Sequence, residues 1–65
     1  MIAREIFDME TKESFSFKEP YAFSTLDGRV PVRFAGQSID GDIYETVHGT
    51  HFLVRYGATE AECLG

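Results

Sequence analysis

Two histidines and the single cysteine are the residues of this chain that could bind a metal. His48 and His51 are separated by two residues, and Cys63 follows twelve positions after His51. Structural zinc takes four ligands, so a carboxylate such as Glu45 would have to complete the set. The expected hairpin places His48 at its turn and Glu45 on the face opposite His51. The sequence therefore predicts no metal site and no cofactor.

The segment Asp40-Gly41-Asp42 begins like a calcium-binding loop. An EF-hand loop needs further carboxylates at fixed spacing and a closing glutamate, and these are missing here. We therefore interpret the segment as an Asp-Gly turn. Its carboxylates suit an arginine of a partner protein, because charge-assisted hydrogen bonds of this type are strong.

The sequence holds no arrangement typical of an enzyme. Nucleophilic catalysis requires a base beside the nucleophile and a third group that orients the base. Cys63 lies near the chain end, and no local spacing places a histidine beside it. The serines lie in no nucleophile-elbow motif, and no glycine-rich phosphate loop occurs. We predict no catalytic residues and a chain that is not an enzyme.

Length and charge exclude further classes of function. The 65 residues allow a single small domain, residues 1–65. Eleven acidic and six basic residues give a net charge of −5, which disfavours binding to nucleic acid and to anionic membranes. One cysteine cannot form an internal disulfide, and the first ten residues lack the apolar run of a signal peptide. We expect a cytoplasmic protein without membrane association.

Glycine spacing is the clearest guide to the elements that would position any site. Six glycines, mostly eight residues apart, separate short runs rich in β-branched and aromatic residues. This pattern predicts an all-β fold, a five-stranded antiparallel meander or barrel with one short C-terminal helical turn capped by Thr59. Its size and strand count are those of SH3-like or OB-like barrels, although no motif of either family occurs. Residues 3–8 and 13–18 are expected to be the first two strands, joined by a polar turn at 9–12.

The first expected hairpin spans residues 21–34. Its turn is Asp27-Gly28, a strong two-residue hairpin signal, and it pairs Leu26 with Arg29. One face then carries mainly apolar side chains, namely Tyr21, Phe23, Thr25, Val30, Val32 and Phe34. Pro31 lacks the amide hydrogen that a central strand donates, so it must lie at an edge or a bulge.

The second expected hairpin spans residues 42–56 and turns at His48-Gly49. Pairing Val47 with Thr50 places Ile43, Val47, Phe52 and Val54 on one mainly apolar face, with Glu45 as the exception. The opposite face carries Tyr44, Thr46, His51, Leu53 and Arg55. This second face is half polar and half apolar, which is typical of a surface that contacts a partner.

These exclusions favour a protein-binding module. Its predicted contact residues lie on the second face of this hairpin and in the loop beside it: Tyr44, Leu53, Arg55, Asp40 and Asp42. Exposed tyrosine, leucine and arginine bordered by charges are the residue types of an interface. Edge pairing by the strand that holds Pro31, or by the N-terminal strand, is a further route to a partner.

The kind of partner is predicted only by analogy. Small acidic proteins without catalytic motifs are typical of phages and mobile elements, where many block a nuclease, a polymerase or a CRISPR complex. We therefore expect a stoichiometric inhibitor or adaptor, anti-CRISPR-like, that acts on a basic, nucleic-acid-handling protein surface. Three alternatives stay open: a small nucleic-acid binder that uses Arg29, Arg33, Arg55 and Tyr44, an accessory subunit of a larger assembly, and a homodimer.

Overall fold

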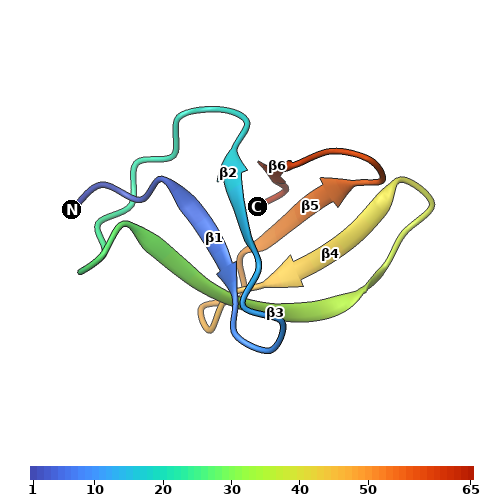
Figure 1. Cartoon of the computed structure of the whole chain (residues 1–65), viewed down its shortest axis with the longest axis horizontal. Coiled ribbons are helices and arrows are strands. Elements are labelled where there is room, and N and C mark those ends of the chain that lie inside the picture. Colours follow the sequence, from blue (N-terminus) through green and yellow to red (C-terminus); the bar gives the residue numbers. More distant parts are fainter.

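Six strands make up the fold in the computed structural model, which describes residues 1–65. The strands are β1 (Glu5–Asp8), β2 (Ser14–Phe17), β3 (Arg29–Gln37), β4 (Gly41–Glu45), β5 (His51–Arg55) and β6 (Glu60–Cys63). They close into a barrel in the order β1-β2-β6-β5-β4-β3 (Figure 1). The predicted small all-β barrel is confirmed, with six strands in place of five. No element is a helix long and apolar enough to cross a membrane.

The barrel is a four-stranded meander closed by the N-terminal hairpin. Strands β3 to β6 pair antiparallel in chain order, while β1 and β2 lie between β3 and β6. Here β1 runs parallel to β3 and β2 runs parallel to β6, with Ile6 opposite Val30 and Phe17 opposite Ala61. The expectation of a wholly antiparallel sheet is therefore wrong at these two junctions. Closure gives every strand two neighbours and covers most of the sheet edges, although the start of β3 pairs only with β1.

Strand β6 replaces the helical turn that we expected after Thr59. It pairs with β5 on one side and with β2 on the other, and Ala61 is only 1% exposed. Glutamate and alanine favour a helix locally, but strand pairing and the burial of Ala61 outweigh this small preference.

The N-terminal hairpin forms as predicted, with β1 antiparallel to β2 and a polar turn between them. Asp8, which is 2% exposed, organises this turn. Its Oδ1 accepts hydrogen bonds from the backbone N–H groups of Glu10 (2.8 Å) and Thr11 (3.3 Å). The buried carboxylate therefore has partners, as a buried charge requires.

The hairpin expected at Asp27-Gly28 is wrong. Residues 18–28 connect β2 to β3 across one end of the barrel and form only an isolated bridge, Ile2 with Ser24. Side chains close the turn instead, because Thr25 Oγ1 accepts from Gly28 N–H (2.6 Å) and Asp27 Oδ1 from Arg29 N–H (3.0 Å). Strand β3 pairs with β1, which buries Val30 and Val32 while Leu26 is fully exposed.

Pro31 lies where the sequence places it, at an open edge. Strand β4 pairs with β3 only from Arg33 onward, so the part of β3 that holds Pro31 has β1 alone as a neighbour. The missing amide hydrogen of proline therefore breaks no pair with β4.

The second hairpin is confirmed, but its register differs by one residue. Tyr44 lies opposite Phe52, and Thr46 and Thr50 bracket a three-residue turn in which Gly49 has φ 86°. Such turns place a left-handed residue last, a role that glycine fills without strain. The shift reverses the two faces of β4, because side chains alternate along a strand.

This reversal overturns two of the expected surface positions. Tyr44 is 6% exposed and belongs to the core, where burial, and then the Asp8 carboxylate, raise the pKa of its phenol. Leu53 is 5% exposed and lies on the outer side of the sheet between Ile43 and Glu62, covered by its neighbours. Neither side chain is available at the surface as we expected.

Aromatic rings fill the barrel and close one of its ends. The core residues are Ala3, Ile6, Val30, Val32, Tyr44, Phe52, Val54 and Ala61. Tyr21, from the connection between β2 and β3, packs over this end with ring centroids 4.8 Å from Phe17 and 5.4 Å from Phe52. Since the barrel is filled by side chains, it leaves no interior cavity for a ligand.

Gly41 is predicted to be essential for packing β4 against β5. A Cβ at this position would overlap the carbonyl oxygen of Val54 and lie 2.7 Å from the Cα of Arg55. Gly41→Ala should lower the free energy of unfolding by about 3 kcal/mol or more in urea titrations, because overpacking moves backbone here. Gly57 has φ 81° and open space around it, so Gly57→Ala should lower the free energy of unfolding by only about 1 kcal/mol, through conformational strain. Equal losses would contradict the clash.

Candidate functional site

Two loops meet at one end of the barrel, on the right of Figure 1. The first joins β3 to β4 after the Gln37–Asp42 pair, and the second joins β5 to β6. In the first loop Ser38 Oγ accepts hydrogen bonds from the N–H groups of Asp40 and Gly41, both at 3.2 Å. In the second, Ala58 N–H donates to the Arg55 carbonyl (2.9 Å). Each loop is therefore a closed turn.

Tyr56 ties these two loops together. Its N–H donates to the Asp40 carbonyl (3.1 Å) and its hydroxyl donates to the Ser38 carbonyl (3.1 Å). The side chain nevertheless remains 59% exposed, and Ile39 beside these contacts is 94% exposed. The ring is therefore held in one orientation at the surface, which reduces the entropy that a partner would have to remove on binding.

Arg55 lies between carboxylates on both sides. Its Nε donates to Glu62 Oε2 (2.6 Å), and its Nη1 lies 3.8 Å from Asp40 Oδ1. This pairing raises the pKa of Arg55, chiefly through the hydrogen bond to Glu62. The same hydrogen bond is the main cause of the lowered pKa of Glu62, to which Lys18 Nζ at 3.9 Å also contributes. The guanidinium is thus held in place and its charge is balanced.

We call Ile39, Asp40, Arg55 and Tyr56 the loop tip. Of the five predicted contact residues, the structure brings Asp40 and Arg55 together here, and Asp42 follows at the base of the loop with Gln37 Nε2 at 3.4 Å. The buried Tyr44 and Leu53 do not belong to it.

Sequence reasoning missed two exposed members of the loop tip, Ile39 and Tyr56. A signal for each was present in the chain. Ile39 is an apolar residue inside the polar loop between two strands. Tyr56 directly precedes Gly57, and glycine is favoured at the third position of a type II turn, where φ is positive, as it is in Gly57 (81°). The side chain of a large apolar residue in a turn usually lies outside the core, so such a residue indicates an exposed apolar position.

The remaining reactive side chains do not form a catalytic group. His51 Nε2 lies 3.3 Å from Glu45 Oε2, and the two side chains are 41% and 34% exposed. Cys63 is exposed and lies opposite Phe52, so it shares the face of that residue and not the outer face of His51. The geometry therefore brings the imidazole near a carboxylate but not near the thiol. No group of three or more histidine, cysteine or acidic side chains lies close enough to hold a metal ion.

Comparison with protein-family models, with curated proteins and with solved structures finds no match for this chain. The function must therefore be argued from the geometry of the loop tip and from the surface around it.

The ion pair of Glu62 predicts a specific pH dependence. Because the folded state lowers the pKa of Glu62 below its ordinary value of 4.5, its contribution to stability is present above that pH. It is lost as the pH falls through the lowered value. Glu62→Gln should therefore be less stable than the parent chain at neutral pH in thermal melts, and the difference should disappear in acid.

Glu60→Gln is the matched control for this measurement, because Glu60 is exposed on the same strand without an ion pair. Its stability should follow that of the parent chain across the pH range. A difference for Glu62→Gln that persists in acid, after the pH has fallen through the lowered pKa of Glu62, would show that the hydrogen-bond geometry matters and the charge does not.

Proposed function

We propose that this chain is a non-catalytic protein-binding module, a stoichiometric inhibitor or adaptor that contacts its partner through the loop tip. The observation that carries the proposal is Tyr56, exposed by 59% yet fixed by hydrogen bonds from both its backbone and its hydroxyl. Tyrosine and arginine are the residues most enriched among those that dominate binding energy at interfaces. In the loop tip they stand beside an almost fully exposed isoleucine.

The number of exposed apolar side chains supports a surface that binds a partner, and not one that only keeps the protein in solution. Ten large apolar side chains are exposed in a chain of 65 residues, of which only 13 residues are buried. Scattered single apolar residues need no explanation, but Ile39 and Tyr56 come from two different loops that hydrogen bonds hold together. The fold thus holds apolar side chains together at the surface, although burying them would enlarge its small core.

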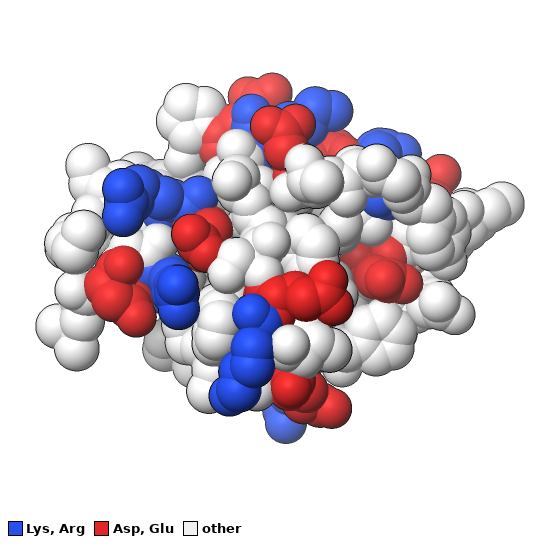
Figure 2. All heavy atoms as spheres, viewed as in Figure 1, with Lys and Arg blue, Asp and Glu red and all other residues white.

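The net charge of −5 favours a basic partner through long-range attraction. Figure 2 shows, however, that acidic and basic side chains alternate over the visible face and form no continuous acidic patch. Charge is therefore proposed to guide the approach of a basic, nucleic-acid-handling protein, while Tyr56 and Ile39 supply most of the contact energy. A source in a phage or mobile element remains part of this proposal by analogy alone.

Nucleic-acid binding receives less support from the geometry. Tyr44, its intended stacking ring, is 6% exposed, and Arg55 is engaged by Glu62 and Asp40. Arg29 and Arg33 lie on β3, away from the loop that Tyr56 occupies. Arg29 and Arg33 therefore do not share a groove with Tyr56, the exposed ring of the loop tip, as single-stranded nucleic-acid binding there would require.

The test of the loop tip is a pull-down from lysate of the native host, treated with nuclease, with the parent chain and its variants. Tyr56→Ala and Ile39→Ala should each weaken binding of the captured protein about tenfold or more, measured with the purified partner. Tyr56→Phe should lose less, because the ring stays. Val47→Ala, 87% exposed at the opposite end of the barrel, should bind like the parent chain. Loss with Val47→Ala but not with Tyr56→Ala would move the contact elsewhere.

Charge reversal tests whether the partner is basic. The double variant with Asp40→Lys and Asp42→Lys should bind more weakly, and its affinity should depend less on salt concentration. The control is the double variant with Glu13→Lys and Glu19→Lys, which changes the net charge equally at exposed positions outside the loop tip. Unchanged affinity of the first variant would exclude these carboxylates as contacts.

A further inference from the structure

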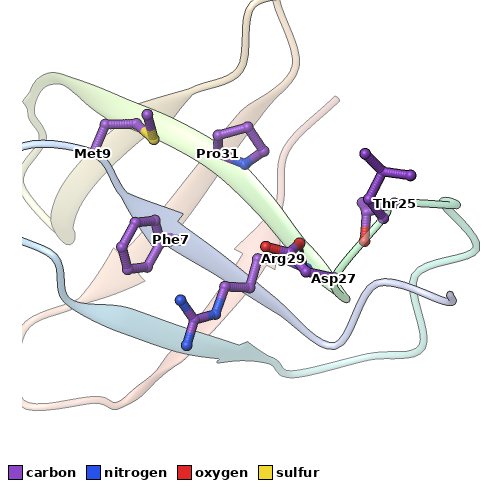
Figure 3. A pocket seen from close by; sticks show the side chains of 7 residues that line it. Phe7, Met9, Thr25, Asp27, Arg29 and Pro31 are labelled. Atoms are coloured by element: carbon purple, nitrogen blue, oxygen red, sulfur yellow. Dashed lines mark hydrogen bonds between the residues drawn. The ribbon is translucent and has the colours of Figure 1, made fainter.

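A second surface lies on the outer side of β1 and β3, on a part of the barrel remote from the loop tip. Figure 3 shows Phe7, Met9 and Pro31 around one hollow, with Asp27 and Arg29 toward its other end. The hollow measures about 350 Å³. Leu26, which also lines it, is 100% exposed and projects from the connection that precedes β3.

This hollow continues toward the β4–β5 turn. A neighbouring hollow shares Met9 and Pro31 with the first and extends to Val47, which is 87% exposed. Met9 itself is 52% exposed. Two cations cover the ring of Phe7, with Arg29 at 4.8 Å and Lys12 at 5.9 Å from its centroid. The apolar side chains of this surface are Phe7, Met9, Leu26, Pro31 and Val47. They form one strip, which we call the β1–β3 groove.

A partner cannot extend the sheet at this groove in the ordinary way. The part of β3 from Arg29 to Val32 has no strand on the side away from β1. Pro31 has no amide hydrogen, and the N–H of Arg29 donates to Asp27 Oδ1 (3.0 Å). The edge therefore has no free donor at these two positions, and contact must come from side chains.

The groove is nearly neutral in a strongly acidic chain. Its charged residues are Glu5, Glu10, Asp27, Glu45, Lys12, Arg29 and Arg33, which sum to −1, so the remainder of the chain carries −4 of the total −5. Two copies of an acidic protein repel each other, and this repulsion is smaller where each presents a nearly neutral face. Both signs are also present in this groove, so facing copies can pair Asp27 of one with Arg29 of the other.

We propose that the β1–β3 groove is a self-association surface on which two copies of this chain pack about a two-fold axis. Leu26 of each copy then enters the hollow of the other, since a two-fold contact is made by the same surface on both copies. The molecule measures 33 × 22 × 20 Å, so a contact confined to the groove is smaller than the interface of about 800 Å² per partner typical of stable complexes, and the expected dimer is a weak one. Dimerisation leaves both loop tips free, because they lie outside the groove.

Sedimentation velocity from about 1 µM to about 1 mM chain tests this proposal at two salt concentrations. The parent chain should convert from monomer to dimer, and the dimer should become tighter as salt rises, because screening weakens the repulsion between two acidic copies. Leu26→Asp should raise the dissociation constant about a hundredfold or more, since each dimer loses two buried leucines and gains two desolvated carboxylates. Ile39→Asp, equally exposed in the loop tip, should dimerise like the parent chain.

Each other outcome overturns the proposal. A parent chain that stays monomeric throughout the range has no self-association surface. A dimer that survives Leu26→Asp, or that Ile39→Asp abolishes, uses another face. Circular dichroism of both variants confirms that they fold, and Leu26→Ser provides a milder change at the same fully exposed position. The proposed function is tested separately, because Leu26→Asp leaves the loop tip intact for partner binding.

Discussion

Closure of the barrel depends on the two parallel junctions that the N-terminal hairpin makes with β3 and β6. Without β1 and β2 the four remaining strands are an open meander whose two outer strands expose their backbone groups. With them, Ile6 and Phe17 enter the same core as Val30 and Phe52. These residues matter in a chain this short, because a small domain buries a smaller fraction of its surface than a large one.

The same closure determines where the loops meet. Strands β3 to β6 alternate in direction, so the β3–β4 and β5–β6 loops emerge at one end and the β4–β5 turn at the other. Tyr56 can then bond to the backbone of Ser38 and Asp40, and Arg55 can lie between Asp40 and Glu62. Glu62 reaches this network only because residues 60–63 form a strand beside β5.

Local patterns in the sequence were sufficient for the elements that pair with their chain neighbours. The β1–β2 hairpin, the β4–β5 hairpin and the edge position of Pro31 follow from alternation, turn residues and the chemistry of proline. The parallel pairing of β1 with β3 could not be predicted in this way, because no local signal reports which distant strand is the better partner. Asp27-Gly28 favours a hairpin as strongly as His48-Gly49 does, and only the position of β1 decides against it.

The candidate site was half predictable for a related reason. Asp40 and Arg55 were identified because loops and strand ends remain exposed in any register. Tyr44 and Leu53 were misplaced, since a turn of three residues in place of two reverses the faces of β4, and burial of Leu53 depends on neighbours from other strands. A single residue in turn length thus decides whether a tyrosine is a contact or part of the core.

Pairing between β2 and β6 also governs how the protein folds. Ser16 lies opposite Glu60, so the contact that completes the barrel joins residues 44 positions apart in the sequence. Sheets that depend on such distant contacts fold slowly, because the chain loses entropy in forming a long loop before any pairing energy is gained. During synthesis β2 is made before β6, so Phe17 remains uncovered on this side until residues 60–63 follow. Until that contact forms, the aromatic ring and the unpaired edges of β2 and β6 stay accessible, which makes the partly folded chain prone to aggregate.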